Sequence, residues 1–307
     1  MRVNEPALPA DREESLNPPV FAAGASLTKL ANDFGTDKGT IILDGHAYTL
    51  VYELLFKNLR LQPINLLEVG LLIGGPELGN DANRKVTDAP SIRLWHQYFP
   101  HAHIYGVDIS DFSQFESEWF SFFKADCGKV EQLRKIARAG VEFEIIIDDG
   151  SHASFHQQLT MLKFWPLLRS GGLYIIEDLH SQPRHYEKSL PNTPKTATQL
   201  KKFVATGCFI GTNALPAVEW GPVEETISNV MLFDNDQLAE MRRIYNRVEG
   251  YRPAVPNHLE RPWPQRVLKR AHIRRLFETM RACAGVLTAQ SHRGHCSPVT
   301  LAIVHKR

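Results

Sequence analysis

Phe143-Glu-Ile-Ile-Ile-Asp-Asp-Gly-Ser-His152 and Gly172-Leu-Tyr-Ile-Ile-Glu-Asp-Leu-His180 share one pattern, a short apolar run that ends in two adjacent carboxylates. Apolar runs of this length predict strands that are buried on both faces, as in a parallel sheet between layers of helices. Ligands of such sheets bind at the carboxyl ends of the strands. We therefore expect one edge of the sheet to gather four acids and a histidine: Asp148, Asp149, Glu177, Asp178 and His152.

The segment between these two stretches predicts a helix. Residues 155–169 carry apolar side chains at helical spacing, and Gly171-Gly172 follows as a stop signal. His152 is expected at the start of this helix, beside the acids that end the preceding strand. Strand, helix and strand together form one βαβ unit.

The same units recur along the chain. Further strands are predicted at 64–70, 103–108, 120–126, 228–233 and 300–304, and helices at 26–34, 46–56, 91–99, 130–139 and 236–247, with Ser26 and Ser91 as caps. This alternation predicts an α/β fold with a doubly wound, mostly parallel Rossmann-like sheet and helices on both faces.

Four carboxylates at one sheet edge repel each other, so something must offset their charge. Bound protons, basic neighbours or a metal ion would each do so, and oxygen-rich clusters suit hard divalent cations such as magnesium, calcium or manganese. A simpler alternative is that one acid of each pair caps the next helix or loop. The residues by themselves leave these alternatives open.

A ligand-binding loop is indicated after the first predicted strand. The glycines of Gly70-Leu-Leu-Ile-Gly-Gly75 allow close approach of the backbone to a ligand. Leu72 stands where the dinucleotide pattern requires its second glycine, so that pattern is not met. Without the polar insertion 76–90, the spacing from Gly70 to Asp108 is near the roughly 20 residues at which an acid meets ribose hydroxyls. The alternative is that Asp108 caps the turn that follows it.

Composition sets outer limits on the function. The 307 residues have a formal charge of +1 and a hydrophobic fraction of 43%, which indicates neither nucleic acid nor a membrane as partner. The four cysteines have no framework spacing, which favours a reduced, cytoplasmic setting. Residues 1–24 are expected to be a flexible arm, and 25–307 one domain, with N-terminal helices (25–62), a ligand-binding core (63–180) and a lid with substrate-side elements (181–307).

Two features of the C-terminal third are ambiguous. The basic run 261–275 could bind a phosphate or a membrane surface, but a solvated helix face is the favoured interpretation. Cys283, His292, His295 and Cys296 match no zinc-site spacing that we recognise.

The order of motifs resembles a known enzyme family. Glu-x-Gly at 68–70, Ser-x-Arg-x-Trp at 91–95, Gly-x-Asp at 106–108, Ile-Asp-Asp-Gly-Ser-His at 147–152 and Gly-Gly-Leu-Tyr-x-Ile-Glu-Asp at 171–178 are similar to class I S-adenosylmethionine-dependent methyltransferases. Within that class, the chain is most similar to the metal-dependent macrolide sugar O-methyltransferases of the mycinamicin type. The resemblance covers about residues 33–180 and includes Phe-Gly-Thr-Asp-Lys-Gly at 34–39.

The resemblance implies a cofactor and a metal. S-adenosylmethionine would be bound with Glu68 near its methionine part, Asp108 on its ribose and Asp126 near its adenine. Magnesium or manganese would be held by three acids, and a histidine would be the catalytic base. The full set of implied residues comprises Glu68, Gly70, Ser91, Asp108, Asp126 and Asp149 for the cofactor, Asp149, Glu177 and Asp178 for the metal, and His152 as base.

The expected activity is methylation of a hydroxyl of a sugar or vicinal diol, in a glycosylated natural product or saccharide. A nucleotide-binding oxidoreductase is the first alternative, and the missing dinucleotide glycine argues against it. A non-catalytic cofactor-binding protein is the second, and the intact acid and histidine set argues against that. The expected partner is a small molecule or saccharide, without nucleic acid or membrane, and assembly into a homo-oligomer stays open.

Overall fold

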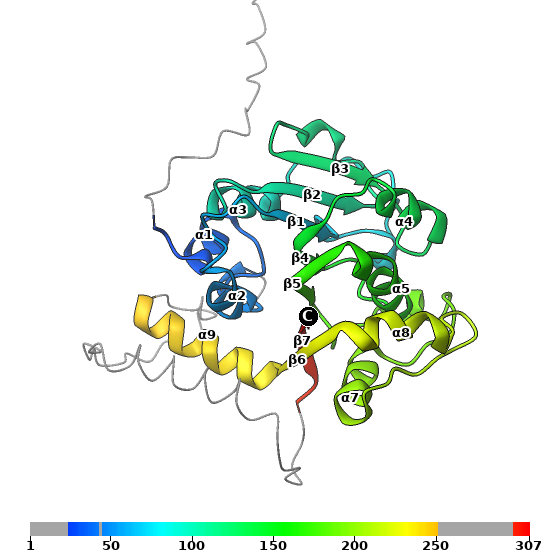
Figure 1. Cartoon of the computed structure of the whole chain (residues 1–307). Helices are drawn as coiled ribbons and strands as arrows, with labels where there is room; N and C mark the ends of the chain where they lie inside the picture. Colours follow the sequence, from blue (N-terminus) through cyan, green and yellow to red (C-terminus); the bar gives the residue numbers. More distant parts are fainter. Residues whose placement is uncertain (1–23, 43–44, 251–296) are drawn as a thin grey trace, which may run out of the picture.

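A computed structural model describes residues 24–42, 45–250 and 297–307. Its centre is a seven-stranded sheet with the strand order β3-β2-β1-β4-β5-β7-β6 (Figure 1). The first five strands pair in parallel, whereas β7 runs antiparallel to both of its neighbours, β5 and β6. The predicted doubly wound, mostly parallel α/β sheet is therefore confirmed.

The strands are β1 (Asn65–Val69), β2 (His103–Asp108), β3 (Phe120–Lys124), β4 (Phe143–Asp148), β5 (Leu168–Ile176), β6 (Ile227–Asp234) and β7 (Val299–Lys306). The α-helices are α1 (Leu27–Phe34), α2 (Tyr48–Phe56), α3 (Pro90–Tyr98), α4 (Val130–Ala137), α5 (Ser154–Phe164), α6 (Arg184–Glu187), α7 (Thr196–Thr206), α8 (Ala217–Thr226) and α9 (Asn235–Glu249). Short 3-10 turns are η2 (Pro76–Leu78), η3 (Ser113–Phe115) and η4 (Trp165–Leu167).

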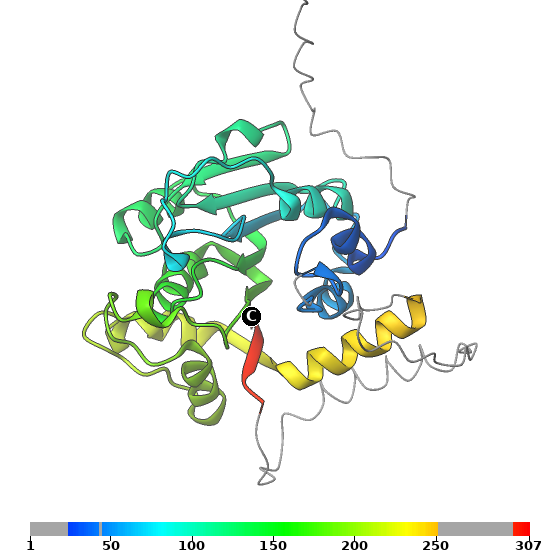
Figure 2. The same cartoon turned by 180° about the vertical axis from the view of Figure 1, so that it is seen from behind.

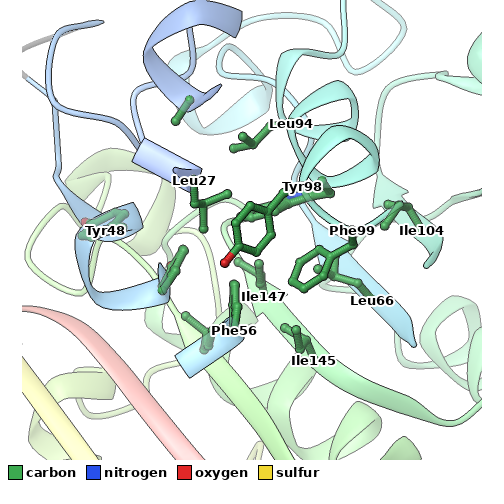
Figure 3. Packing of buried hydrophobic residues seen from close by; sticks show 14 of the residues in the cluster. Leu27, Tyr48, Phe56, Leu66, Leu94, Tyr98, Phe99, Ile104, Ile145 and Ile147 are labelled. Carbon is green, nitrogen blue, oxygen red and sulfur yellow. The ribbon is translucent and has the colours of Figure 1, made fainter. Parts of the chain in front are cut away.

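Helices cover both faces of the sheet, as the sequence predicts. Helices α1, α2, α3 and α9 lie on one side, and α4, α5, α7 and α8 lie on the other (Figures 1 and 2). Alternate residues of β4 point to opposite layers, so Ile145 and Ile147 join the first hydrophobic cluster and Ile146 joins the second. Figure 3 shows the first cluster, where Phe56 and Phe99 pack over the buried strands.

Three local expectations about helix ends can be compared with the structure. Ser26 caps α1, because its hydroxyl accepts a hydrogen bond from the amide of Lys29 at 3.2 Å. Ser91 is not a cap, because α3 already begins at Pro90, a residue suited to the first helical position. The expected glycine stop after residue 169 is wrong. Helix α5 ends at Phe164, where Trp165-Pro166 begins a 3-10 turn, and Gly171-Gly172 lies inside β5.

The carboxyl ends of the central strands are aligned at one edge. The ladder continues one residue past the strands, because the amide of Gly70 donates to Val107 at 2.8 Å and that of Asp149 to Val69 at 2.8 Å. Gly70 has a φ of +83°, and a Cβ there would lie 2.1 Å from the carbonyl oxygen of Asp149. Only glycine fits between these strand ends, so the first acid-bearing loop and the glycine loop lie against each other.

Several sequence features lie outside the described residues. These are the expected arm 1–24 except for its last residue, the basic run 261–275, and the Cys283, His292, His295 and Cys296 set. Within the described ranges, every helix is too short or too polar to cross a bilayer.

Candidate active site

A cavity of about 410 Å³ opens at the carboxyl ends of the parallel strands. Most of the site residues predicted from the sequence line it together: Gly70, Ser91, Asp108, Asp126, Asp149, His152 and Asp178. The other two, Glu68 and Glu177, are almost completely buried just behind this lining. The structure thus brings residues from five strand ends into one place.

Asp108 shapes the glycine-loop side of the cavity. One carboxylate oxygen accepts from the amide of Leu71 at 2.9 Å, and the other accepts from the amide of Ser110 at 2.7 Å. Burial raises the pKa of Asp108, and these amide hydrogen bonds act in the opposite direction. Asp108 therefore does cap the following turn, and it also lines the cavity, so the two interpretations of this acid are compatible.

Glu68 is connected to the cavity through its neighbours. The Ser91 hydroxyl donates to Glu68 Oε2 at 2.6 Å, and the ammonium of Lys38 lies 3.4 Å from Oε1. Burial raises the pKa of Glu68 to about 7. Because Ser91 lines the cavity and Glu68 does not, Ser91 is the member of this pair that a ligand would touch.

Lys38 is the basic neighbour that offsets the acid cluster. Its ammonium lies 2.9 Å from Oε2 of Glu177 and also contacts the carboxylate of Asp149. Tyr52 donates to the other oxygen of Glu177 at 2.6 Å. Burial disfavours the charged ammonium, but the four surrounding carboxylates, with Asp149 and Glu177 the strongest, hold the pKa of Lys38 well above its usual value. A cation therefore already lies between Asp149 and Glu177.

The loop that carries Lys38 is fixed from both sides. Within the loop, the amide of His46 donates to the carbonyl of Asp37 at 2.8 Å. From α9, the Arg242 guanidinium donates to the carbonyl of Gly45 at 2.8 Å. These contacts position Lys38 before any ligand arrives, so the charge arrangement is a property of the fold.

Asp178 is surrounded by imidazoles. The Tyr48 hydroxyl donates to Oδ1 of Asp178 at 2.9 Å, and His46 and His180 each place Nδ1 within 3.8 Å of that oxygen. His152 places Nε2 3.8 Å from Oδ2. Burial opposes ionisation of Asp178, but these neighbours outweigh it and its pKa lies below the usual value. Asp178 is therefore the most readily ionised acid of the cluster.

The donor atoms at this end of the cavity can accept a cation. Single ligand atoms of Asp149, His152 and Asp178 all lie within 4.8 Å of one another. Glu177 is not in that group, and its two oxygens contact Lys38 and Tyr52. The residues thus fit a divalent ion, although the geometry groups His152 with two of the predicted ligands.

The backbone is unusual at two of these residues. His152 and Asp178 have φ angles of 58° and 52°, in the left-handed region. Non-glycine residues adopt it rarely, and such residues cluster at functional sites. His152 also lies two residues before α5, which begins at Ser154, so the expectation that it starts the helix is wrong. A left-handed turn between β4 and α5 separates it from the helix.

Sequence reasoning missed several residues of the site. The sequence patterns assign no role to Lys38, Tyr52 and His180, nor to Tyr48 and His46. One signal was present: a lysine in the small, polar stretch Gly35-Thr-Asp-Lys-Gly39 is a natural counter-charge for an acid cluster. Tyr48 and Tyr52 are four residues apart, so one face of α2 presents both hydroxyls to the acids.

Comparison with known proteins supports the resemblance found in the sequence. No family model matches the chain. It is 35% identical over 156 residues to mycinamicin VI 2''-O-methyltransferase from Micromonospora griseorubida, which covers 50% of this chain and 36% of that protein. It is 34% identical over 153 residues to 8-demethyl-8-(2-methoxy-alpha-L-rhamnosyl)-tetracenomycin-C 3'-O-methyltransferase from Streptomyces olivaceus, with the same coverage of 50% and 36%.

A solved structure shows the same fold. The MycE methyltransferase from the mycinamycin biosynthetic pathway, in complex with Mg, SAH and mycinamycin VI, superposes with a TM-score of 0.51 at 28% identity. The match covers 68% of this chain and 52% of that one. The chain spans only about a third of the length of the curated relatives that it matches. It is therefore similar to these sugar O-methyltransferases over about a third of their length.

Proposed function

We propose that this chain is an S-adenosylmethionine-dependent, divalent-metal-dependent O-methyltransferase that acts on a hydroxyl of a sugar or vicinal diol, in a glycosylated natural product or saccharide. One observation carries the proposal. A single cavity is lined both by the glycine loop and Asp108 and by Asp149, His152 and Asp178. Residues suited to bind a cofactor and residues suited to bind a metal thus face the same cavity. Transfer of a group between two bound molecules requires that arrangement.

The acid cluster would hold the metal. We propose Asp149, Glu177 and Asp178 as its ligands, with Glu177 exchanging its contact with Lys38 for the ion. The ammonium that now lies between Asp149 and Glu177 supports this, because it shows that the pair accepts a cation. When bound, a divalent ion supplies Lewis acidity that lowers the pKa of an acceptor hydroxyl and orients it.

His152 would remove the proton from that hydroxyl. Its Nε2 lies 3.8 Å from Asp178, so the imidazolium that forms on proton transfer would have a carboxylate beside it. Its position in the loop before α5 lets it line the cavity without belonging to the helix. The protein's remaining task is alignment, because a sulfonium methyl group is already activated.

The chain's organisation and setting complete the proposal. We propose that residues 25–62 are the N-terminal helical part, 63–180 the cofactor and metal core, and the described residues of 181–307 the lid and substrate-side elements. The first of these supplies Lys38, Tyr48 and Tyr52 to the acid cluster, which supports its part in the site. A cytoplasmic setting is proposed because the four cysteines have no disulfide-framework spacing.

Two measurements test this function. First, the protein is incubated with S-adenosylmethionine, magnesium and rhamnosylated or macrolide acceptors of the kinds named for its relatives, and methylated product is sought by mass spectrometry. Second, calorimetry compares S-adenosylhomocysteine binding by the wild type and Asp108→Ala, which should bind much more weakly. Equal affinity in both proteins, or full turnover in the presence of chelator, would contradict the proposal.

A further inference from the structure

Arg84 is a half-buried basic residue of the polar insertion 76–90, and it lines the cavity. Its guanidinium donates hydrogen bonds to the carbonyl oxygens of Leu72 and Ile73 in the glycine loop. Its Nε donates to the Ser110 hydroxyl at 3.2 Å. One side chain thus connects the loop after β1 with the loop after β2.

Asp108 connects the same two loops through its carboxylate. It accepts from the amide of Leu71 at 2.9 Å and from the amide of Ser110 at 2.7 Å. Ser110 is completely buried, so its amide and its hydroxyl are both used inside this contact. Burial raises the pKa of Asp108, and the positive charge of Arg84 acts in the opposite direction. A carboxylate and a guanidinium therefore hold the two loops together.

The glycine loop has few other contacts that fix its shape. The side chain of Ile73 is 64% exposed, so packing does not hold it. Asn80 donates to the carbonyl of Gly74 at 3.2 Å, and the insertion thereby binds three successive carbonyls of the loop. In a trans peptide the N–H points away from the C=O, so the amides of Ile73 and Gly74 point away from Arg84. Neither amide donates to a backbone acceptor within the described ranges.

Gly74 leaves the space that the guanidinium occupies. Its φ of +109° is a conformation that residues with a side chain rarely adopt, and a Cβ there would lie 2.6 Å from Nη1 of Arg84. The sequence predicts that glycines of this loop allow close approach to a ligand. At Gly74 the group that approaches is an arginine of the same chain.

The insertion that carries Arg84 is itself anchored to the sheet side. Val86 is 5% exposed and belongs to the first hydrophobic cluster. Its carbonyl accepts from the side chain of Gln114 at 2.8 Å, and the ammonium of Lys124 lies 3.2 Å from Oδ1 of Asn83. The position of Arg84 is therefore set by the protein before a ligand is bound.

We propose that Arg84 is a positioning residue that holds the glycine loop in the shape that receives the cofactor. The assignment rests on the proposed function, in which this loop and Asp108 bind S-adenosylmethionine. Arg84 acts through the loop and does not need to touch the cofactor. Without the guanidinium, two loop carbonyls and the Ser110 hydroxyl lose their donor. The ligand must then order the loop itself, which reduces its affinity.

The test measures cofactor and metal binding side by side. In calorimetry, Arg84→Ala should bind S-adenosylhomocysteine roughly 10–100-fold more weakly than the wild type. Arg84→Lys should recover little of this loss, because an ammonium lacks the planar fork that reaches several acceptors. Manganese affinity should stay unchanged in both variants, because Arg84 holds the loops after β1 and β2 whereas the acids proposed for the metal follow β4 and β5.

A second substitution tests the contact between Arg84 and the glycine loop directly. Gly74→Ala should weaken S-adenosylhomocysteine binding in the wild type and should weaken it less in Arg84→Ala, where the guanidinium is gone. If Arg84→Ala does not fold, Arg84→Gln takes its place in both comparisons. The matched control is Lys85→Ala, which removes an exposed basic residue of the same insertion and should bind as the wild type does.

The possible outcomes separate this inference from the proposed function. Wild-type affinity in a folded Arg84→Ala or Arg84→Lys variant would overturn the inference alone. Effects of Gly74→Ala and Arg84→Ala that simply add would also overturn it, as would a loss of manganese affinity equal to the loss of cofactor affinity. A wild type that does not bind S-adenosylhomocysteine would overturn the proposed function as well.

Discussion

The ammonium of Lys38 lies 2.9 Å from Oε2 of Glu177, and the two side chains are only 2% and 1% exposed. They come from distant parts of the chain, the loop after α1 and the residue after β5. A buried pair of this kind costs desolvation energy that is recovered only while both partners are present. The acid cluster therefore depends on one lysine for its charge balance when no other cation is bound.

Lys38→Met should destabilise the protein strongly in chelator. Removal of one partner leaves a buried charge uncompensated, so the free energy of unfolding should fall by about 3–5 kcal/mol. Added manganese should recover part of the loss, because the ion supplies the missing charge. Urea unfolding with and without manganese measures both effects.

The matched control for that variant is Lys29→Met, which removes a half-exposed lysine that pairs with Asp33 four residues away. Exposed pairs of this kind contribute about 0.3–0.5 kcal/mol, so the control should be nearly as stable as the wild type. If Lys38→Met unfolds at the same urea concentration as the wild type, Lys38 does not balance the cluster.

Substitutions that keep the side-chain volume but remove the negative charge can show which acids bind the metal. Asp178→Asn and Glu177→Gln should each lower manganese affinity more than roughly 10–100-fold. A loss of about 10–100-fold is what is expected when the residue removed only hydrogen-bonds to a metal ligand. Titration followed by electron paramagnetic resonance measures this in the absence of any acceptor. Glu144→Gln, which removes a carboxylate at the opposite end of β4, is the control. Unaltered affinity in Glu177→Gln would leave this residue as a partner of Lys38 and Tyr52 only.

The sequence predicts the sheet edge well because its signals are local. The apolar runs of β4 and β5 lead into paired acids, and β2 ends in Asp108, so Asp108, Asp149 and Asp178 could be placed together from topology alone. Strand β7 is different. It was predicted as a strand, but its insertion between β5 and β6 depends on long-range pairing that no local pattern records.

The basic side of the site could not be predicted for the same reason. Lys38 is 139 residues from Glu177 in the chain, and Tyr52 is 125 residues from it. Neither residue has a local signature beyond a polar loop or an apolar helix face. Three ways to offset the acid charge were open from the sequence, and only the packing of α2 and its preceding loop against the sheet edge shows a basic neighbour there.

Glu68 should make stability depend on pH between about 4.5 and 7. Burial raises its pKa in the folded protein to about 7, so the folded state binds a proton that the unfolded state releases. The contribution of Glu68 to stability is therefore largest below pH 4.5, falls as pH rises, and is constant again above 7. Relative to Glu68→Gln, the wild type should lose up to about 3 kcal/mol across this window. Unfolding curves in chelator at several pH values measure the difference, and Glu131→Gln, at an exposed position on α4, should show none.

His152→Ala decides between the two roles that the geometry allows for this residue. Its Nε2 faces Asp178 and one of its ring nitrogens belongs to the group of atoms that could bind a cation, yet we propose that it is the base. A base is not needed to hold the ion or the cofactor, so the variant should keep manganese and S-adenosylhomocysteine affinity. Its single-turnover rate should fall by about 10²–10⁴-fold. Manganese affinity that drops together with the rate would make His152 a metal ligand, and an unchanged rate would remove it from the reaction. His46→Ala is the comparison, because His46 lies 3.6 Å from the same carboxylate and is assigned neither role.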